Sequence, residues 1–254
     1  MPHSPDYLAR LAAACAADPR IHGLVLFGSS ADRSRADEWS DHDFAVITDP
    51  EHIGELRTDL SWLPDHEQLV AWAREHHDGF KAIDIHGSVI EFAVTDLAGL
   101  ATFFADAWAI AYGGEEVEAT MRAVAAKPAP NATPDPHRDV AVFLAALLVG
   151  VGRARRGERI SATGSVRGLA LQHLLLLLTP LLPPDPRLDT LDPTRRFELA
   201  HPILGRRIAD ALDLPLEECA RTLLDVADDE AGTRWGGYPK AAVAVVRDRL
   251  GWTT

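Results

Sequence analysis

The sequence predicts an α+β fold, in which an N-terminal domain with a small mixed β-sheet flanked by helices precedes an all-α helical bundle. Short apolar runs typical of buried strands alternate with helical patterns before residue 127. Leucine- and alanine-rich helical patterns fill the chain after residue 137. Between them, residues 127–136 contain four prolines, which cannot continue a helix or a central strand. We therefore expect domains at 1–127 and 137–254, joined by a proline-rich linker at 128–136.

The elements of the N-terminal domain follow from local patterns. Ser4 and Pro5 are typical of a helix N-cap and first turn, and the helix should stop near Asp18. Apolar runs then predict strands at 21–27 and 43–48, and helical patterns predict helices at 50–61 and 65–76. A hairpin is expected over 80–94, with its turn at His86-Gly87.

The second half is expected to be helical throughout. The most apolar run, 169–178, contains Gln172 and His173 and stops before Pro180, so it predicts a buried helix rather than a membrane span. Prolines separate the elements of this half. The predicted helices are 138–156, 164–178, 203–212, 216–228 and 239–250.

Composition is that of a globular protein, with 47% hydrophobic and 25% charged residues. Cys15 and Cys219 lie far apart in helical, partly apolar stretches, which favours buried free thiols in a reducing cytosol over a disulfide or a metal site. The first eleven residues lack the basic and apolar regions of a secretion signal. A cytoplasmic protein with no membrane partner is expected.

The net charge of −13 argues against nucleic acid as a partner, because binding there depends on neutralising phosphates. The charge is placed unevenly. Residues 1–127 hold 9 Lys/Arg against 22 Asp/Glu and carry all of the excess, whereas the second half is balanced. The acidic half either serves solubility or attracts a cationic partner.

The stretch 26–44 begins with a turn that suits a phosphate group. A buried strand leads to Gly28, whose missing side chain lets the backbone come close to a ligand. Ser29 and Ser30 add hydroxyl and N–H groups at this turn. These three residues are the candidate phosphate-binding turn.

Two carboxylates begin the next strand. Asp41 and Asp43 are two residues apart, so the strand period places them on one face, with their Cα atoms about 7 Å apart. Such a pair can hold two divalent cations about 4 Å apart, the arrangement that stabilises attacking and leaving oxygens in phosphoryl transfer. His42 between them should point to the opposite face, where packing or a supporting contact is expected rather than metal ligation.

The hairpin offers a third carboxylate. If His86-Gly87 form a two-residue turn, Asp84 lies opposite Val89 and shares a face with Glu91. The opposite face would then be apolar, formed by Ile83, Ile85, Ile90 and Phe92. The alternative is a half-exposed hairpin with solvated acids. Because the register is inferred, both Glu91 and Asp84 stay candidates for the third position.

The spacing of these residues resembles the signature of the polymerase-beta nucleotidyltransferase superfamily. That signature is a Gly-Ser turn, about ten residues, and then Asp-x-Asp, as in Gly28-Ser29 and Asp41-His42-Asp43. The run Trp39-Ser-Asp-His-Asp-Phe44, an acidic hairpin and a helical C-terminal half look like the aminoglycoside and lincosamide adenylyltransferases within it. The motif covers roughly residues 21–95.

The resemblance implies a role for each matching residue. Ser29 would bind the triphosphate, Asp41 and Asp43 would bind Mg²⁺, and Glu91 would ligate metal or deprotonate the acceptor hydroxyl. The implied reaction is transfer of a nucleoside monophosphate, AMP from ATP, to a hydroxyl of a small molecule, with two Mg²⁺ ions. An aminoglycoside-like antibiotic fits as the acceptor, which implies a role in antibiotic resistance.

Three arginines are further candidates for the triphosphate. Arg33 and Arg35 lie in the loop after the phosphate turn, where solvation is the alternative. Arg196, in the densest polar cluster of the helical half, offers a guanidinium for phosphate or a salt bridge with Asp192 or Glu198. The eleven histidines lack the spacing of zinc ligands.

Two other functions stay open. One keeps the chemistry but modifies a protein or a tRNA, as toxin- and antitoxin-type nucleotidyltransferases do; the lack of a basic stretch argues against tRNA. The other is a non-catalytic nucleotide-binding module. Clustered carboxylates without a metal repel one another, which argues against a module that has kept all three acids.

Overall fold

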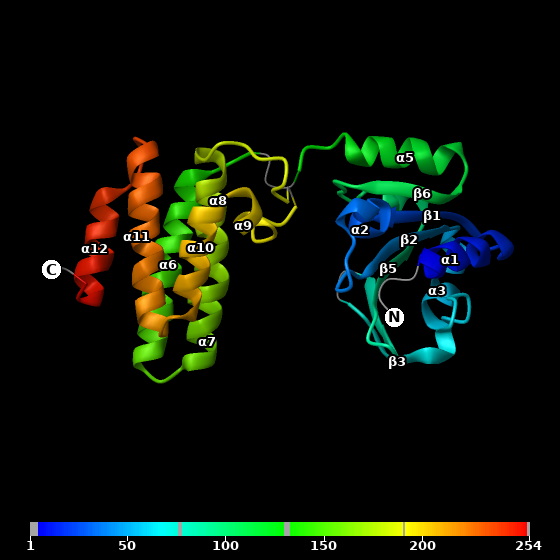
Figure 1. Ribbon diagram of the computed structural model, residues 1–254, viewed down its shortest axis with the longest axis horizontal. Helices are drawn as coiled ribbons and strands as arrows, with labels where there is room; N and C mark the ends of the chain where they lie inside the picture. Colours follow the sequence, from blue (N-terminus) through cyan, green and yellow to red (C-terminus); the bar gives the residue numbers. More distant parts are fainter. Residues whose placement is uncertain (1–4, 76–77, 130–132, 190, 253–254) are drawn as a thin grey trace. The chain divides into compact units, whose positions relative to one another are not determined.

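A computed structural model of the chain describes residues 5–75, 78–129, 133–189 and 191–252. The chain divides into two compact units, Met1–Pro128 and Ala129–Thr254, which are considered separately (Figure 1). The division falls at the start of the predicted linker 128–136, of which residues 130–132 lie outside the described part. The predicted α+β class and mixed sheet are confirmed.

The first unit is built on a six-stranded sheet with the order β3-β4-β5-β2-β1-β6. Only the central pair β2 and β5 is parallel, and every other neighbouring pair is antiparallel. β1 and β2 are buried along nearly their whole length, as their continuous apolar runs predict. The strands are β1 Ile21–Phe27, β2 His42–Thr48, β3 Leu69–Arg74, β4 Gly79–Asp84, β5 Val89–Thr95 and β6 Trp108–Gly113.

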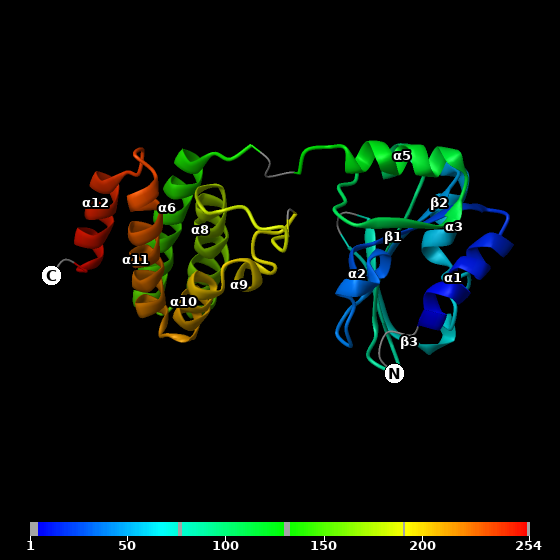
Figure 2. The same cartoon turned by 45° about the horizontal axis from the view of Figure 1, so that its top comes forward.

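Helices pack on both faces of this sheet. Alternation along β2 sends Phe44 and Val46 to a core beneath α1 (Pro5–Ala17) and α3 (Pro50–Thr58). It sends Ala45 and Ile47 to a second core beneath α4 (Leu97–Leu100) and α5 (Glu115–Ala125). Figure 2 shows α5 along the β6 side of the sheet and α1 beside α3. The remaining short helices are α2 (Gly28–Ala31), η1 (Arg33–Arg35) and η2 (His66–Gln68).

The predicted helix at 65–76 is wrong. Its described part forms η2 and the edge strand β3, which pairs antiparallel with β4. The segment is rich in helix-forming residues, but pairing with β4 and the packing of Trp72 against Phe80, 6.3 Å between ring centroids, override that local preference. The sequence reading also missed β6 and α5.

The hairpin lies where the sequence places it, but its register differs by one residue from the prediction. The loop has three residues, because Gly87 adopts a left-handed conformation (φ 81°) and Asp84 N–H donates to Ser88 O. Ile83 therefore pairs with Val89, and Lys81 pairs with Glu91. A shift of one residue reverses the faces, so Asp84 and Glu91 point to opposite sides of the sheet. Ile83 and Ile85, expected in the core, are 42% and 58% exposed.

Among its described residues, the second unit contains helices and no strand. One hydrophobic core joins them. The predicted helices are present with shifted ends, and the apolar run 169–178 lies in a helical segment whose side chains Leu174, Leu175, Leu177 and Leu178 are buried. The elements are α6 Pro136–Arg155, α7 Arg159–Thr163, η3 Gly164–Ala170, α8 Leu171–Leu178, η4 Thr179–Leu181, α9 Phe197–Ala200, α10 Pro202–Asp213, α11 Leu216–Arg234 and α12 Lys240–Leu250.

Both cysteines are free and buried, as predicted. Burial, together with the charge of Asp18, raises the pKa of the Cys15 thiol to about 12, so this thiol is unreactive at neutral pH. Of the helices in the described ranges, none combines the length and the apolar character needed to cross a bilayer.

Candidate active site

The predicted phosphate turn is a sharp reversal at the end of β1. Gly28 has a φ of 52°, a left-handed conformation that a residue with a side chain adopts only with strain. Its N–H donates to Ala107 O at 3.1 Å, which ties the turn to the segment before β6. The chain then enters the single turn of α2, whose Ser29 is half-buried. Gly28 and Ser29 thus form the turn between β1 and α2, and phosphate binding by this turn stays a prediction.

Ser30 has a structural role that the sequence reading missed. Its side chain is 3% exposed, and its hydroxyl accepts a hydrogen bond from Asp43 N–H at 3.0 Å. The same hydroxyl donates to the carbonyl oxygen of Asp41 at 3.5 Å. Ser30 therefore fixes the start of β2, and nucleotide binding by Ser30 stays a prediction.

We predict that Ser30→Ala destabilises the protein and that Ser29→Ala does not. Removing the Ser30 hydroxyl leaves the Asp43 N–H without this acceptor, which costs about 1–3 kcal/mol. The melting temperature of the Ser30 variant should fall by several degrees, and its catalytic rate should fall with it. Ser29→Ala, the matched control, should keep its melting temperature and weaken nucleotide binding. Equal melting temperatures for the two variants would contradict this assignment.

His42 lies on the face of β2 opposite Asp43, as the strand period predicts. It is 4% exposed and stacks on Tyr7, with 4.6 Å between ring centroids and 24° between ring planes. Tyr7 belongs to α1, which covers the other face of the sheet. The prediction that His42 packs away from Asp43 is confirmed.

The parallel pairing of β2 and β5 brings Glu91 next to Asp43. These two residues are Cα partners in adjacent strands, so their side chains leave the sheet side by side on the same face. Asp41 lies two residues earlier in the sequence, just before β2 begins. The structure thus places Asp43 and Glu91 side by side, and a site formed by all three acids stays a prediction.

Asp84, the rival third carboxylate, lies on the other face and caps the hairpin turn. Its carboxylate oxygen accepts hydrogen bonds from the N–H groups of His86 (2.8 Å) and Ser88 (2.9 Å). Partial burial opposes its ionisation, but these hydrogen bonds outweigh burial and lower the pKa of Asp84. Asp84 is a turn residue and does not join the other acids.

A lysine that the sequence reading missed also lies on the acidic face. Lys81 is the Cα partner of Glu91 in β4, and its Nζ is 2.5 Å from Glu91 Oε1. The hydrogen bond to Glu91 outweighs partial burial and, with the charges of Glu91, Glu75 and Asp41, raises the pKa of the Lys81 ammonium group. The sequence signal was available: Lys81 alternates with the buried Phe80 and Ala82.

The carboxylates do not form a preorganised metal-binding site. Within the described ranges, the structure has no group of three or more His, Cys, Asp or Glu side chains that could hold a metal ion. Glu91 instead pairs with Lys81. Asp43 and Glu91 are thus neighbours in the sheet, but in the described residues no three of these side chains form a metal-binding group.

The two loop arginines differ in their surroundings. Arg35 is mostly buried and lies 3.3 Å from Asp106, so its charge is already compensated. Arg33, in the same 3₁₀ helix, is exposed. Arg33 is the arginine of this loop that is better placed to meet an anion from solvent.

Arg196 belongs to the second unit, where it precedes α9 with a left-handed backbone (φ 62°) and a half-buried side chain. Asp192, one of its two expected partners, accepts hydrogen bonds from the N–H and hydroxyl of Thr194 instead. The neighbouring Arg195 lies 3.6 Å from the buried Asp189. Contact between Arg196 and a triphosphate stays a prediction.

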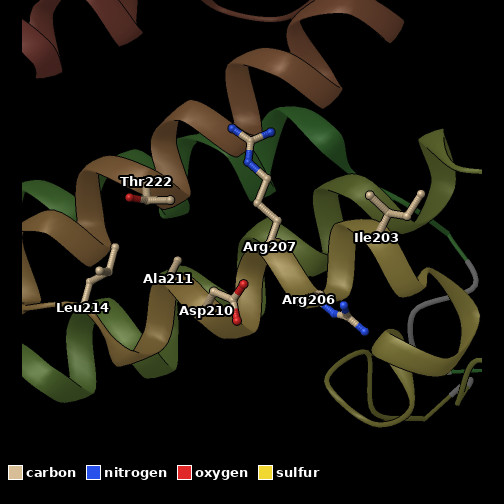
Figure 3. A pocket seen from close by; sticks show the side chains of 7 residues that line it. All are labelled: Ile203, Arg206, Arg207, Asp210, Ala211, Leu214 and Thr222. Carbon is tan, nitrogen blue, oxygen red and sulfur yellow. The ribbon is translucent and has the colours of Figure 1, made fainter.

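The second unit also has an open pocket of about 410 Å³ between α10 and α11 (Figure 3). Arg207 at its wall is bound to Asp229 at 2.7 Å, and Ile203 is 91% exposed. The lining mixes both charges with apolar groups, namely Ile203, Arg206, Arg207, Asp210, Ala211, Leu214 and Thr222.

A pocket of about 550 Å³ lies in the first unit at the far end of β2 from Asp41 and Asp43. It is lined by Thr48 and Asp49 together with Asp96 and Glu115. Asp49 is bound to His22, 2.9 Å between Oδ2 and Nε2, and Asp96 caps α4 through Gly99 N–H. Asp41, Asp43 and Glu91 do not line this pocket.

Comparison with known proteins finds only low similarity to this chain. No protein-family model and no curated protein matches it. Among solved structures, it is similar to an aminoglycoside 6-adenyltransferase from Bacillus subtilis, with 11% sequence identity over 97% of this chain and 90% of that chain, and a TM-score of 0.30. A similarity this low carries no conclusion about activity, which has to be inferred from the residues of the site.

Proposed function

We propose that the protein is a metal-dependent nucleotidyltransferase that moves a nucleoside monophosphate, AMP from ATP, to a hydroxyl group of a small acceptor. The observation that carries this proposal is the register of the two central strands. Asp43 lies beside Glu91, Asp41 precedes it by two residues in the sequence, and the Gly28-Ser29 turn lies at the end of the neighbouring strand β1. This combination would join a phosphate-binding turn to three carboxylates on one surface.

The donor set suits Mg²⁺ in its chemistry. Carboxylate oxygens are the ligands that Mg²⁺ takes in proteins, and the neighbouring positions of Asp41, Asp43 and Glu91 allow them to share ions. These three residues would hold the two ions, once the Glu91 side chain leaves Lys81. When bound, the ions would lower the pKa of the acceptor hydroxyl and stabilise the leaving pyrophosphate.

The residues of the chain would position the reactants and take up the proton. The acceptor oxygen bonds to the α-phosphorus as the bond from that phosphorus to the bridging oxygen breaks, and pyrophosphate leaves with the bridging oxygen. Glu91 accepts the hydroxyl proton. Gly28 and Ser29 orient the triphosphate, Ser30 keeps Asp43 in place, and Arg33 meets the phosphate charge.

A pyrophosphate-release screen tests the proposal. The full-length protein, ATP and Mg²⁺ are incubated with aminoglycosides, lincosamides, proteins or tRNA, and we expect release with a small hydroxylated acceptor. Release with a protein alone would favour the toxin- or antitoxin-type function. Absence of release with every class, together with no Mg²⁺-dependent thermal shift by a non-hydrolysable triphosphate, would contradict a nucleotidyltransferase.

A cationic acceptor of the aminoglycoside type suits the acidic first unit, whose residues carry the net charge of −13. We predict that the acceptor KM rises steeply between about 50 and 500 mM salt, because screening weakens attraction between exposed charges. The KM for ATP should change much less, since metal coordination holds the triphosphate. A neutral lincosamide is the control, with a flat KM. If a cationic acceptor also shows a flat KM, the excess charge serves solubility only.

A further inference from the structure

Lys81 is a positive charge at the position where a metal ion would meet Glu91. It lies opposite Glu91 in the neighbouring strand, and its ammonium nitrogen is 2.5 Å from Glu91 Oε1. The Lys81 and Glu91 side chains are 47% and 33% exposed, so the pair is accessible to solvent and to ions.

The acids on this face have two arrangements available. In the arrangement that the structure shows, Glu91 is held by Lys81, and no three-carboxylate group within the described ranges is ready for a metal. In the other, Glu91 turns to an ion shared with Asp43, its neighbour across the parallel pair. An ammonium group cannot stay on the same carboxylate oxygen while a divalent cation binds there, because the two charges repel each other.

We propose that Lys81 competes with the divalent metal for Glu91, so that the metal site is completed only when this ion pair opens. The inference rests on the proposed function. Lys81 acts here as a positioning residue, through the direction in which it holds the Glu91 carboxylate. Its long flexible stem lets the ammonium move away without any change of the sheet. An exposed pair of this kind is weak, so metal binding can displace it.

Mn²⁺ binding to the full-length protein tests this inference directly. Free Mn²⁺ is measured by electron paramagnetic resonance, with no nucleotide and no acceptor present. Lys81→Met should lower the Kd for Mn²⁺ by about fivefold to tenfold, because it removes both the competing partner and a nearby positive charge. Lys81→Arg keeps the charge and should stay within about twofold of the unchanged protein.

Arg122→Gln is the matched control for loss of one positive charge. Arg122 forms an exposed ion pair with Glu118, 2.6 Å between Nη2 and Oε1, within α5 of the same unit. This variant should bind Mn²⁺ with an unchanged Kd. An equal gain in affinity for the Arg122 and Lys81 variants would overturn the inference, since the effect would then come from net charge alone.

The Glu91→Gln background separates competition from a general field effect. With no carboxylate at position 91, removal of Lys81 should change the Kd by less than about threefold. The same fivefold to tenfold gain in both backgrounds would show that Lys81 does not act through Glu91. Asp43→Asn should abolish Mn²⁺ binding whether or not Lys81 competes. If neither the unchanged protein nor the Lys81→Met variant binds Mn²⁺, the proposed function fails and the inference fails with it. If Mn²⁺ binding depends on Asp43 but has the same Kd with and without Lys81→Met, the inference alone is overturned.

Discussion

Asp43→Asn is expected to lower the rate of nucleotidyl transfer by more than about hundredfold and to leave the fold intact. Asp43 is the neighbour of Glu91 in the sheet and follows Asp41 by two residues, so an amide here removes one of the three carboxylates that would hold the ions. The backbone N–H of Asp43 still donates to Ser30, which keeps β2 in place. Loss of repulsion between neighbouring acids should hold or raise the melting temperature.

The measurements are pyrophosphate release at saturating ATP and Mg²⁺ and a thermal melt of the apo protein. Asp49→Asn is the matched control, because it makes the same change just beyond the other end of β2, where the side chain is 60% exposed and bound to His22. The control should keep its activity. An Asp43 variant with more than about a tenth of the original activity in Mg²⁺ would refute its assignment as a metal ligand.

Glu91→Gln should lower kcat by about a hundredfold or more, whereas Asp84→Asn should change it by less than about twofold. The two acids are seven residues apart in one hairpin, and the register puts only Glu91 on the face of Asp43. The amide at position 91 can neither accept the hydroxyl proton nor carry the charge that a metal ligand needs. Asp84 caps the turn, and an asparagine oxygen can still accept its hydrogen bonds from His86 and Ser88 N–H.

Single-turnover rates of both variants, with melting temperatures as a check on folding, decide between the two acids. A severe loss in the Asp84 variant, with a stable fold and an active Glu91 variant, would mean that the hairpin register differs from the one described here. Loss in both variants would show that the turn itself controls the rate.

Local pattern determined the parts of this protein that depend on neighbours in sequence. The apolar runs of β1 and β2, the amphipathic helices after the prolines and the burial of both cysteines follow from composition and period. Alternation alone predicted that His42 packs on the face opposite Asp43, and the stacking of His42 on Tyr7 confirms the position of His42.

Only the tertiary structure decided how separate strands meet. A loop of three residues rather than two moved the hairpin by one position, and because the side-chain period of a strand is two, that step reversed every face. The 65–76 segment became a strand because β4 offered it a partner, against its own helical preference. The approach of Lys81 to Glu91, and of the Ser30 hydroxyl to the start of β2, likewise joins residues ten to thirteen positions apart through hydrogen bonds that no local period encodes.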